Sequence, residues 1–226
     1  MRVLVVAAHP DDEVLGCGGT IARLASEGHT IDVAILGEGI TSRSAARMGA
    51  DPGALERLKG DAVEAMSRLG VNSPRFFNLP DNRFDTLPTL DVIKAVEGLV
   101  DDVVPERIYT HHGGDLNIDH GVVHRAVLTA TRPIKGHPVQ EVLTFEIGSS
   151  TDWALQQFAP AFRPNVFVDI GKTLEKKQRA MEAYVTEARP FPHPRSPEAI
   201  EAYAKRWGAT AGLDAAEAFE LIRSIH

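Results

Sequence analysis

Short apolar runs alternate with amphipathic stretches through the first half of the chain. Four of these runs have the continuous apolar character of strands buried on both faces, at residues 3–8, 31–36, 75–79 and 107–110. Between them, apolar residues recur at helical spacing in three stretches, at residues 14–27, 54–69 and 90–103. Because parallel strands need helical crossovers, this alternation predicts a mostly parallel sheet with helices on both faces.

The second half of the chain continues this sheet. A helical pattern at 122–131 leads to apolar runs at 142–146 and 166–170, which we expect to be further strands. Together these elements predict an α/β fold, a Rossmann-like three-layer sandwich with a mostly parallel central sheet. With 226 residues, 43% of them hydrophobic, the chain can bury one sizeable core but is short for two. We therefore expect a single domain over residues 1–226.

The C-terminal third has a different pattern. Helical spacing resumes after Thr173, and four prolines within 186–197 exclude a helix there. They predict an extended loop, which contains His193. The last segment, 196–225, is predicted to form two helices that are split near 208–212.

Charge and cysteine content narrow the function. The formal net charge of -7 argues against a phosphate-attracting surface, so we expect no nucleic-acid partner and a small substrate. The first apolar run is too short for a membrane span or a signal-peptide core, which predicts a cytoplasmic protein. The single cysteine, Cys17, excludes an intramolecular disulfide and a zinc site built from cysteines. Any metal would have to be held by histidines and carboxylates.

The first strand ends in five residues that can bind a metal and move a proton, His9-Pro10-Asp11-Asp12-Glu13. In open α/β sheets, ligands bind at the carboxyl ends of the strands. We expect Pro10 to open the next helix, where the helix dipole favours first-turn carboxylates by about 0.3–1 kcal/mol. His9 and Asp12, three residues apart, can converge on one metal, while Asp11 points elsewhere and can act as a general base. A plain acidic helix start is the alternative.

A second cluster follows the fourth strand, with four histidines in sixteen residues: His111, His112, His120 and His124. A catalytic zinc site has three protein ligands. His9 and Asp12 leave one ligand to supply, and His120 is our candidate. We expect His124, one helical turn further, to pack nearby without binding the metal. Of His111 and His112, either one is buried under the loop and the other exposed, or at least one belongs to the catalytic site.

Both clusters closely resemble motifs of the LmbE-like, or PIG-L, family of zinc-dependent sugar N-deacetylases. The resemblance extends to Gly-Cys-Gly-Gly-Thr at 16–20, Gly-Glu-Gly-Ile-Thr-Ser-Arg at 37–43, Leu-Pro-Asp-Asn-Arg-Phe-Asp at 79–85 and Arg-Ser-Pro-Glu-Ala at 195–199. It implies that His9, Asp12 and His120 bind Zn²⁺, other divalent metals being allowed, and that Asp11 is the general base. The implied reaction removes the acetyl group from an N-acetylglucosamine-type conjugate. Relatives of this kind also form homo-oligomers.

One position departs from the family pattern, in which a histidine three residues before the third ligand stabilises the oxyanion or acts as an acid. Asn117 stands there in this chain. An amide can donate a hydrogen bond but cannot carry a proton. His111, His112 and His193 are therefore candidates for that role.

The resemblance also implies sugar contacts. Arg43 and Asp81 lie on loops after the second and third strands, where members of the family bind the sugar. We expect His193 to bind the substrate as well. An exposed surface ion pair between Arg43 and Asp81 is the alternative.

Two other classes of function compete with a deacetylase. A nucleotide-binding oxidoreductase is suggested by the glycines at 16–19, but they lack the GxGxxG spacing. A non-catalytic zinc-binding module is the other alternative. A structural zinc site is usually closed by four ligands and has no use for the carboxylate of Asp11, which favours an enzyme.

Overall fold

The computed structural model describes residues 1–40 and 52–226. In this part of the chain a seven-stranded sheet has the order β3-β2-β1-β4-β5-β7-β6. The strands are β1 (Arg2–Ala7), β2 (Thr30–Gly37), β3 (Arg75–Leu79), β4 (Arg107–His111), β5 (Glu141–Phe145), β6 (Val166–Asp169) and β7 (Ala216–Ser224). The first five run parallel, whereas β7 pairs antiparallel with both β5 and β6. The predicted mostly parallel α/β sheet is confirmed.

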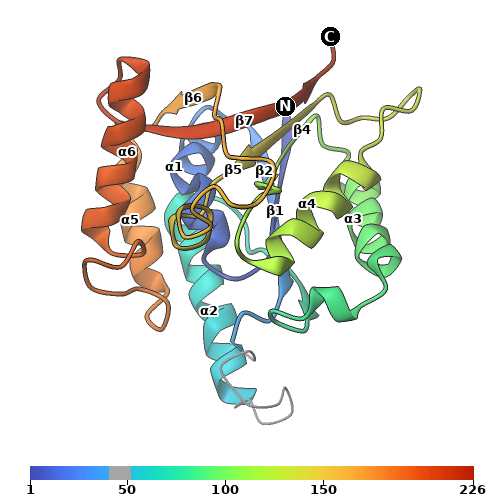
Figure 1. Ribbon diagram of the computed structural model, residues 1–226, viewed down its shortest axis with the longest axis horizontal. Helices are drawn as coiled ribbons and strands as arrows, with labels where there is room; N and C mark the ends of the chain where they lie inside the picture. Colours follow the sequence, from blue (N-terminus) through green and yellow to red (C-terminus); the bar gives the residue numbers. More distant parts are fainter. Residues whose placement is uncertain (41–51) are drawn as a thin grey trace.

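Helices cover both faces of the sheet, as Figure 1 shows. The helices are α1 (Asp12–Ser26), α2 (Pro52–Leu69), α3 (Thr89–Val103), α4 (Ile118–Ala130), α5 (Leu174–Ala183) and α6 (Pro197–Ala211), with short turns η3 (Phe84–Thr86) and η4 (Gly148–Asp152). None of the helices in the described ranges is both long and apolar enough to cross a bilayer.

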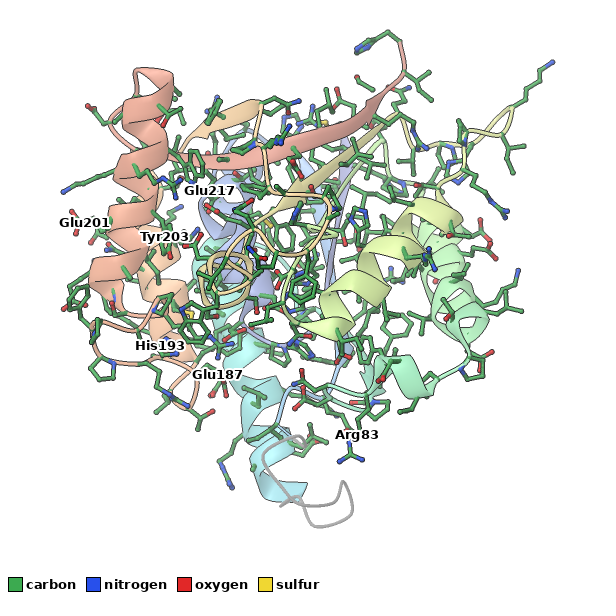
Figure 2. The ribbon with its side chains drawn as sticks, viewed as in Figure 1. Arg83, Glu187, His193, Glu201, Tyr203 and Glu217 are labelled. Carbon is green, nitrogen blue, oxygen red and sulfur yellow. The ribbon has the colours of Figure 1, made fainter. Side chains whose placement is uncertain are left out.

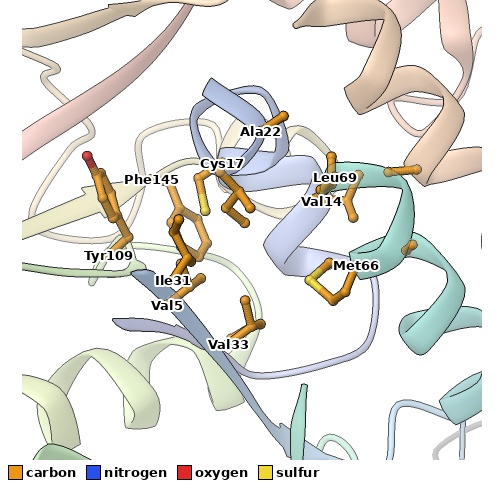
Figure 3. Close-up of a cluster of buried hydrophobic side chains, with 14 of the residues drawn as sticks. Val5, Val14, Cys17, Ala22, Ile31, Val33, Met66, Leu69, Tyr109 and Phe145 are labelled. Atoms are coloured by element: carbon orange, nitrogen blue, oxygen red, sulfur yellow. The ribbon is translucent and has the colours of Figure 1, made fainter. Parts of the chain in front are cut away.

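Strand β1 divides the hydrophobic core in two because its side chains alternate between the faces. Val3, Val5 and Ala7 pack towards α1, α2 and α5. Leu4, Val6 and Ala8 pack towards α3 and α4. Figure 3 shows the first cluster, where Val5 and Val33 of the sheet face Cys17 and Met66 of the helices. The predicted three-layer sandwich is therefore confirmed.

The prediction of two C-terminal helices is wrong for the second one. Helix α6 ends at Ala211, and Gly212 then adopts a left-handed φ of 73°. The residues that follow form β7, in which Phe219 pairs with Phe145 and Leu221 with Leu143 of β5. Ala and Glu favour a helix locally, but the pairing and the burial of alternate apolar residues outweigh that preference.

Helix α1 also differs from the prediction, because Pro10 does not open it. The helix begins at Asp12, and Asp11 precedes it as the N-cap residue with φ 104° and ψ -27°. A positive φ is uncommon and costly for a residue with a side chain. It turns the backbone of Asp11 out of the helix, so that the side chains of Asp11 and Asp12 point in different directions.

A second irregularity in α1 lies at Cys17, whose φ of -148° breaks the helix. The groups freed by this break are bound by two residues from the C-terminal third. Glu217 accepts hydrogen bonds from the backbone N–H of Gly19 at 2.9 Å and of Thr20 at 2.7 Å. Lys177 donates to Leu15 O at 2.8 Å and pairs with Glu217 at 2.6 Å.

The glycines at 16–19 serve packing in this helix. A Cβ on Gly16 would lie 2.3 Å from the ring of Phe145, and one on Gly19 would lie 2.8 Å from Ile170. Both glycines therefore allow α1 to approach the sheet closely. This packing accounts for them without a nucleotide.

Candidate metal centre and active site

The carboxyl ends of β1 and β4 bring three predicted metal ligands together. His9 follows β1, Asp12 is the first residue of α1, and His120 lies in the first turn of α4. Helix α4 begins four residues before its predicted start at residue 122. Asp12 Oδ2 lies 3.3 Å from His9 Nδ1 and 3.2 Å from His120 Nε2. All three residues are buried, and their potential ligand atoms lie within 4.8 Å of one another. One ion can contact all three.

The chemistry of this group fits a divalent metal. His120 Nε2 is buried and makes no well-directed hydrogen bond to the described residues, although it lies 3.2 Å from Asp12 Oδ2. An unsatisfied buried nitrogen costs free energy unless another partner takes its lone pair. Two imidazole nitrogens and one carboxylate oxygen are a donor set that suits zinc and leaves a position open for substrate.

Carboxylates hold the far side of each imidazole. His9 Nε2 lies 2.9 Å from Asp119 Oδ2 and 3.3 Å from Asp81 Oδ1. His120 Nδ1 lies 3.0 Å from Asp115 Oδ2. Such partners fix the tautomer of a ligating histidine and aim its other nitrogen at the metal.

Backbone donors fix one of these carboxylates in turn. Asp119 accepts hydrogen bonds from the N–H of Asn82 at 2.6 Å and of Phe84 at 2.9 Å. The orientation of His9 is therefore set by the loop after β3.

The charges of the centre are strongly coupled. Burial lowers the pKa of His9, but its contacts with Asp119 and Asp12 outweigh burial and raise the pKa to about 10. Burial likewise lowers the pKa of His120, and the charges of Asp12 and Asp115 raise it to about 9. Burial raises the pKa of Asp12, yet His120 and His111 hold it well below its usual range. The centre thus favours a positive charge beside the Asp12 carboxylate. Protonated histidines can supply that charge, and so can a divalent cation.

Asp11 lies beside this centre with a distinct environment. Its carboxylate is buried, and neither oxygen accepts a hydrogen bond from the described residues. Arg195 Nη1 forms an ion pair with Asp11 Oδ2 at 3.0 Å. Burial raises the pKa of Asp11 well above its usual range, while the charge of Arg195 opposes the shift. A carboxylate with a raised pKa and free lone pairs is a suitable general base.

Glu13 supports Asp11 from behind. The backbone N–H of Asp11 donates to Glu13 Oε2 at 3.2 Å, and the hydroxyl of Tyr184 donates to Glu13 Oε1. Burial raises the pKa of Glu13 to about 7, although the Tyr184 hydrogen bond acts against it. These contacts stabilise the unusual backbone conformation of Asp11.

His111 packs against two of the predicted metal ligands, His120 and Asp12. Its Nε2 accepts a hydrogen bond from Ala8 N at 2.8 Å, and its ring stacks on His120 with centroids 3.9 Å apart. Burial, together with the neighbouring His120, holds the pKa of His111 well below its usual range. The neutral imidazole of His111 therefore holds the ring of His120 in place by stacking against it.

His112 contacts residues other than the three predicted metal ligands. Its Nδ1 lies 2.8 Å from Glu220 Oε2 of β7, and its Nε2 lies 2.8 Å from Pro160 O. Neither His111 nor His112 is exposed, so the alternative in which one of them faces solvent is wrong. His124 packs nearby as expected, with Nδ1 2.9 Å from His111 O.

Asn117 caps helix α4 at the edge of the centre. Its side-chain oxygen accepts a hydrogen bond from Asp119 N at 2.9 Å. Its Nδ2 donates to Asn82 Oδ1 at 3.0 Å. One of its two amide hydrogens is thus used by Asn82, and the amide carries a second.

The predicted substrate residues have different positions. Asp81 is buried against His9, which disagrees with an exposed surface pair. His193 lies on the loop between α5 and α6, where its Nδ1 accepts a hydrogen bond from Arg195 N at 3.1 Å. Arg43 lies outside the described residues.

Sequence reasoning gave no role to Arg195, Glu187 and Asp115. Arg195 contacts Asp11, and its Nη1 also lies 2.8 Å from Glu187 Oε2. Both Arg195 and Glu187 lie on the loop between α5 and α6, and Figure 2 labels Glu187. The Arg-Ser-Pro motif could have pointed to Arg195. An arginine in a motif of a protein with an acidic active site can form an ion pair with one of the carboxylates. Asp115 had no comparable signal, since its spacing to His120 is common in loops.

Comparisons with known proteins identify related chains. A profile of the PIG-L family, described as GlcNAc-PI de-N-acetylase, matches residues 4–131, more than half of the chain. The uncharacterized deacetylase YaiS of Escherichia coli K12 is 31% identical over 173 residues, covering 74% of this chain and 81% of its own length. A 1D-myo-inositol 2-acetamido-2-deoxy-alpha-D-glucopyranoside deacetylase of Rhodococcus opacus is 30% identical over 242 residues, covering 82% and 81%.

The fold also occurs with another activity. The crystal structure of the 4-carboxy-2-hydroxymuconate hydratase GalB of Pseudomonas putida KT2440 superimposes with a TM-score of 0.78. It is 20% identical and covers 100% of this chain and 97% of its own. A likeness at this identity shows the fold alone, so the chemistry has to be argued from the site residues.

Proposed function

The chain belongs to this PIG-L family of de-N-acetylases, and we propose that it is a metal-dependent hydrolase that removes the N-acetyl group from an N-acetylglucosamine-type conjugate. The observation that carries the proposal is the convergence of His9, Asp12 and His120 on one point, with the carboxylate of Asp11 held beside them by Arg195. The deacetylase relatives, which match most of the chain, support the same reaction.

His9, Asp12 and His120 would hold the metal, and zinc is the ion we expect. A divalent ion bound there would polarise the acetamide carbonyl and make a water molecule more acidic. The carboxylates of Asp81, Asp115 and Asp119 keep the two imidazoles aimed at that ion.

Asp11 takes the proton from the attacking water. Its burial favours the protonated form, so it accepts the proton readily and can return it to the leaving amine. Arg195 holds the direction of the carboxylate through the ion pair at 3.0 Å. One residue thereby serves as base and then as acid.

Asn117 fits the role of hydrogen-bond donor to the oxyanion. Its second amide hydrogen is available for the negative charge that develops on the acetyl oxygen. His111 and His112 are less suited to donating a proton, because His111 is wholly buried and both ring nitrogens of His112 have partners. Asp81, Arg43 and His193 remain our candidates for contacts with the sugar.

Acetate release tests the proposal directly. The purified protein, loaded with Zn²⁺, is incubated with a panel of N-acetylglucosamine conjugates, and acetate and free amine are quantified. We expect both products in equal amounts, loss of activity after chelation and recovery when Zn²⁺ is restored. Asp11→Asn should keep the metal and lose at least about a hundredfold in kcat. Full activity in the chelated protein would refute the proposal.

The same preparation separates the competing classes of function. Saturable binding of a nicotinamide nucleotide without acetate release would favour an oxidoreductase. Zinc-dependent stability without turnover of any conjugate would favour a non-catalytic zinc module.

A further inference from the structure

An exposed aromatic hollow lies beside the metal centre. It has a volume of about 460 Å³ and is lined by Trp153, Arg189, Pro190, Phe191, Pro192 and His193. Trp153 is 51% exposed and Phe191 is 65% exposed. Large apolar side chains that gather at an exposed hollow mark a binding site more often than isolated ones do.

One wall of the hollow is attached to the metal centre through η4. Thr151 in η4 donates a hydrogen bond to Asp115 Oδ2 at 3.1 Å, and Asp115 is the carboxylate behind His120. Trp153 follows η4 directly. The position of Trp153 is thereby fixed relative to a metal ligand.

The other wall is attached to the general base. Arg195 pairs with Asp11 and donates its backbone N–H to His193 Nδ1. Figure 2 shows His193 and Glu187 on this loop, below Tyr203 of α6. The rings of His193 and Trp153 meet edge to face, with their centroids 5.5 Å apart. Both walls are thus connected to residues of the same centre, and they join at this ring contact.

The chemistry of the hollow differs from that of the metal centre. The centre consists of carboxylates and imidazoles, whereas the hollow is formed by an indole, a phenyl ring and prolines. The guanidinium of Arg189 donates to the carbonyl oxygens of Thr186 and Ala188 in its own loop. Both hydrogen bonds come from Nη1 and hold this guanidinium against its own loop, and the rest of the lining is mostly apolar. An uncharged apolar or aromatic group fits best.

We propose that this hollow binds an apolar or aromatic aglycone of the amino-sugar substrate, with Trp153 stacking against it and Phe191 closing its side. The inference rests on the proposed deacetylase function and specifies its substrate class. The acetamide lies at the metal centre, and the group attached to the sugar extends towards Trp153. Aromatic faces bury large areas of such groups. Trp153 and Phe191 are therefore specificity-determining residues.

Kinetics on two substrates test the inference. We compare kcat/KM for free N-acetylglucosamine and for its phenyl glycoside in the wild type, Trp153→Ala, Phe191→Ala and Trp153→Phe. The wild type should prefer the phenyl glycoside by about tenfold, an amount that burial of one aromatic ring can supply. Trp153→Ala should abolish this preference mainly through KM and change free N-acetylglucosamine less than about twofold. Trp153→Phe should restore part of it.

Phe158→Ala is the matched control. Phe158 is 50% exposed but does not line the hollow, so its removal should leave the preference intact. Equal effects of Trp153→Ala on both substrates, or no preference in the wild type, would overturn the inference. A change in solution mass in Trp153→Ala would also overturn it, because the patch would then join two copies of the chain. Absence of acetate from both substrates and from every conjugate of the panel would instead defeat the proposed deacetylase function.

Discussion

The carboxylate of Asp11 and the guanidinium of Arg195 lie 3.0 Å apart, although they come from opposite ends of the chain. Among the described residues, neither oxygen of Asp11 accepts a hydrogen bond. The direction of this carboxylate therefore depends on the ion pair. Arg195 is in turn anchored by Glu187 at 2.8 Å, so the proposed base is aimed by a loop of the C-terminal third.

Replacing Arg195 tests this dependence. Arg195→Ala should lower kcat roughly tenfold to a hundredfold with little change in KM, because a misdirected base leaves substrate binding intact. Arg195→Lys keeps the charge and should recover part of the rate. Steady-state acetate release and metal content per chain are the measurements. A parallel loss of bound metal would show that Arg195 supports the whole centre and not the base.

Metal binding should depend on His120 and not on its neighbour one helical turn away. The wild type is expected to bind one Zn²⁺ per chain and to gain about 2.7 kcal/mol of unfolding free energy at a hundredfold excess over Kd. His120→Ala should lose both effects. His124→Gln is the matched control on the same helix and should keep both. Calorimetric titration and thermal unfolding report the two quantities, and equal zinc binding by both variants would contradict the assigned ligand set.

Asn117 combines a structural role with a proposed catalytic one, and two substitutions separate them. Asn117→Ser retains an oxygen that can cap α4, whereas Asn117→Ala removes the cap and should cost about 1 kcal/mol of stability. Both lose the amide donor and should lower kcat by roughly 10- to 100-fold. Urea unfolding and acetate release are compared. If Asn117→Ser has the wild-type kcat, the amide does not stabilise the oxyanion.

Glu146 should make the stability of the protein depend on pH. Burial raises the pKa of Glu146 to about 7 from its usual 4.5, although a hydrogen bond from Trp207 acts against this. Between these two values the folded protein holds a proton that the unfolded chain has released. The stability contribution is therefore complete below about pH 4.5 and is lost as the pH rises through about 7.

Glu146→Gln keeps the hydrogen-bond acceptor and removes the titration. The variant should lose less stability than the wild type on going from pH 5 to pH 8, by about 1–3 kcal/mol. Urea unfolding at several pH values measures the difference. Parallel pH profiles for the two proteins would mean that Glu146 stays ionised in the fold.

The sequence predicted the fold class, and it placed the candidate metal site, because both depend on short-range patterns. Continuous apolar runs mark the buried parallel strands, and the polar residues at their carboxyl ends meet at one edge of the sheet. His9, Asp12 and His120 could thus be brought together without coordinates. Their convergence on Asp12 Oδ2 agrees with that reasoning.

Other features depend on contacts that no local pattern encodes. The segment that forms β7 has the composition of a helix, and its pairing with β5 decides its structure. The left-handed conformation of Asp11 is supported by Glu13 and Tyr184, which are far apart in the sequence. The contact between His112 and Glu220 likewise joins the end of β4 to β7. Such long-range pairs need the tertiary structure.

The break in α1 at Cys17 has a consequence for the order of events during synthesis. The helix that presents Asp12 is completed by Lys177 and Glu217, and these residues leave the ribosome long after it does. Translation proceeds at about 5–20 residues per second. The first helix therefore waits about 10–40 seconds for the side chains that satisfy its broken turn, and the nascent chain acquires its finished centre only when β7 is made.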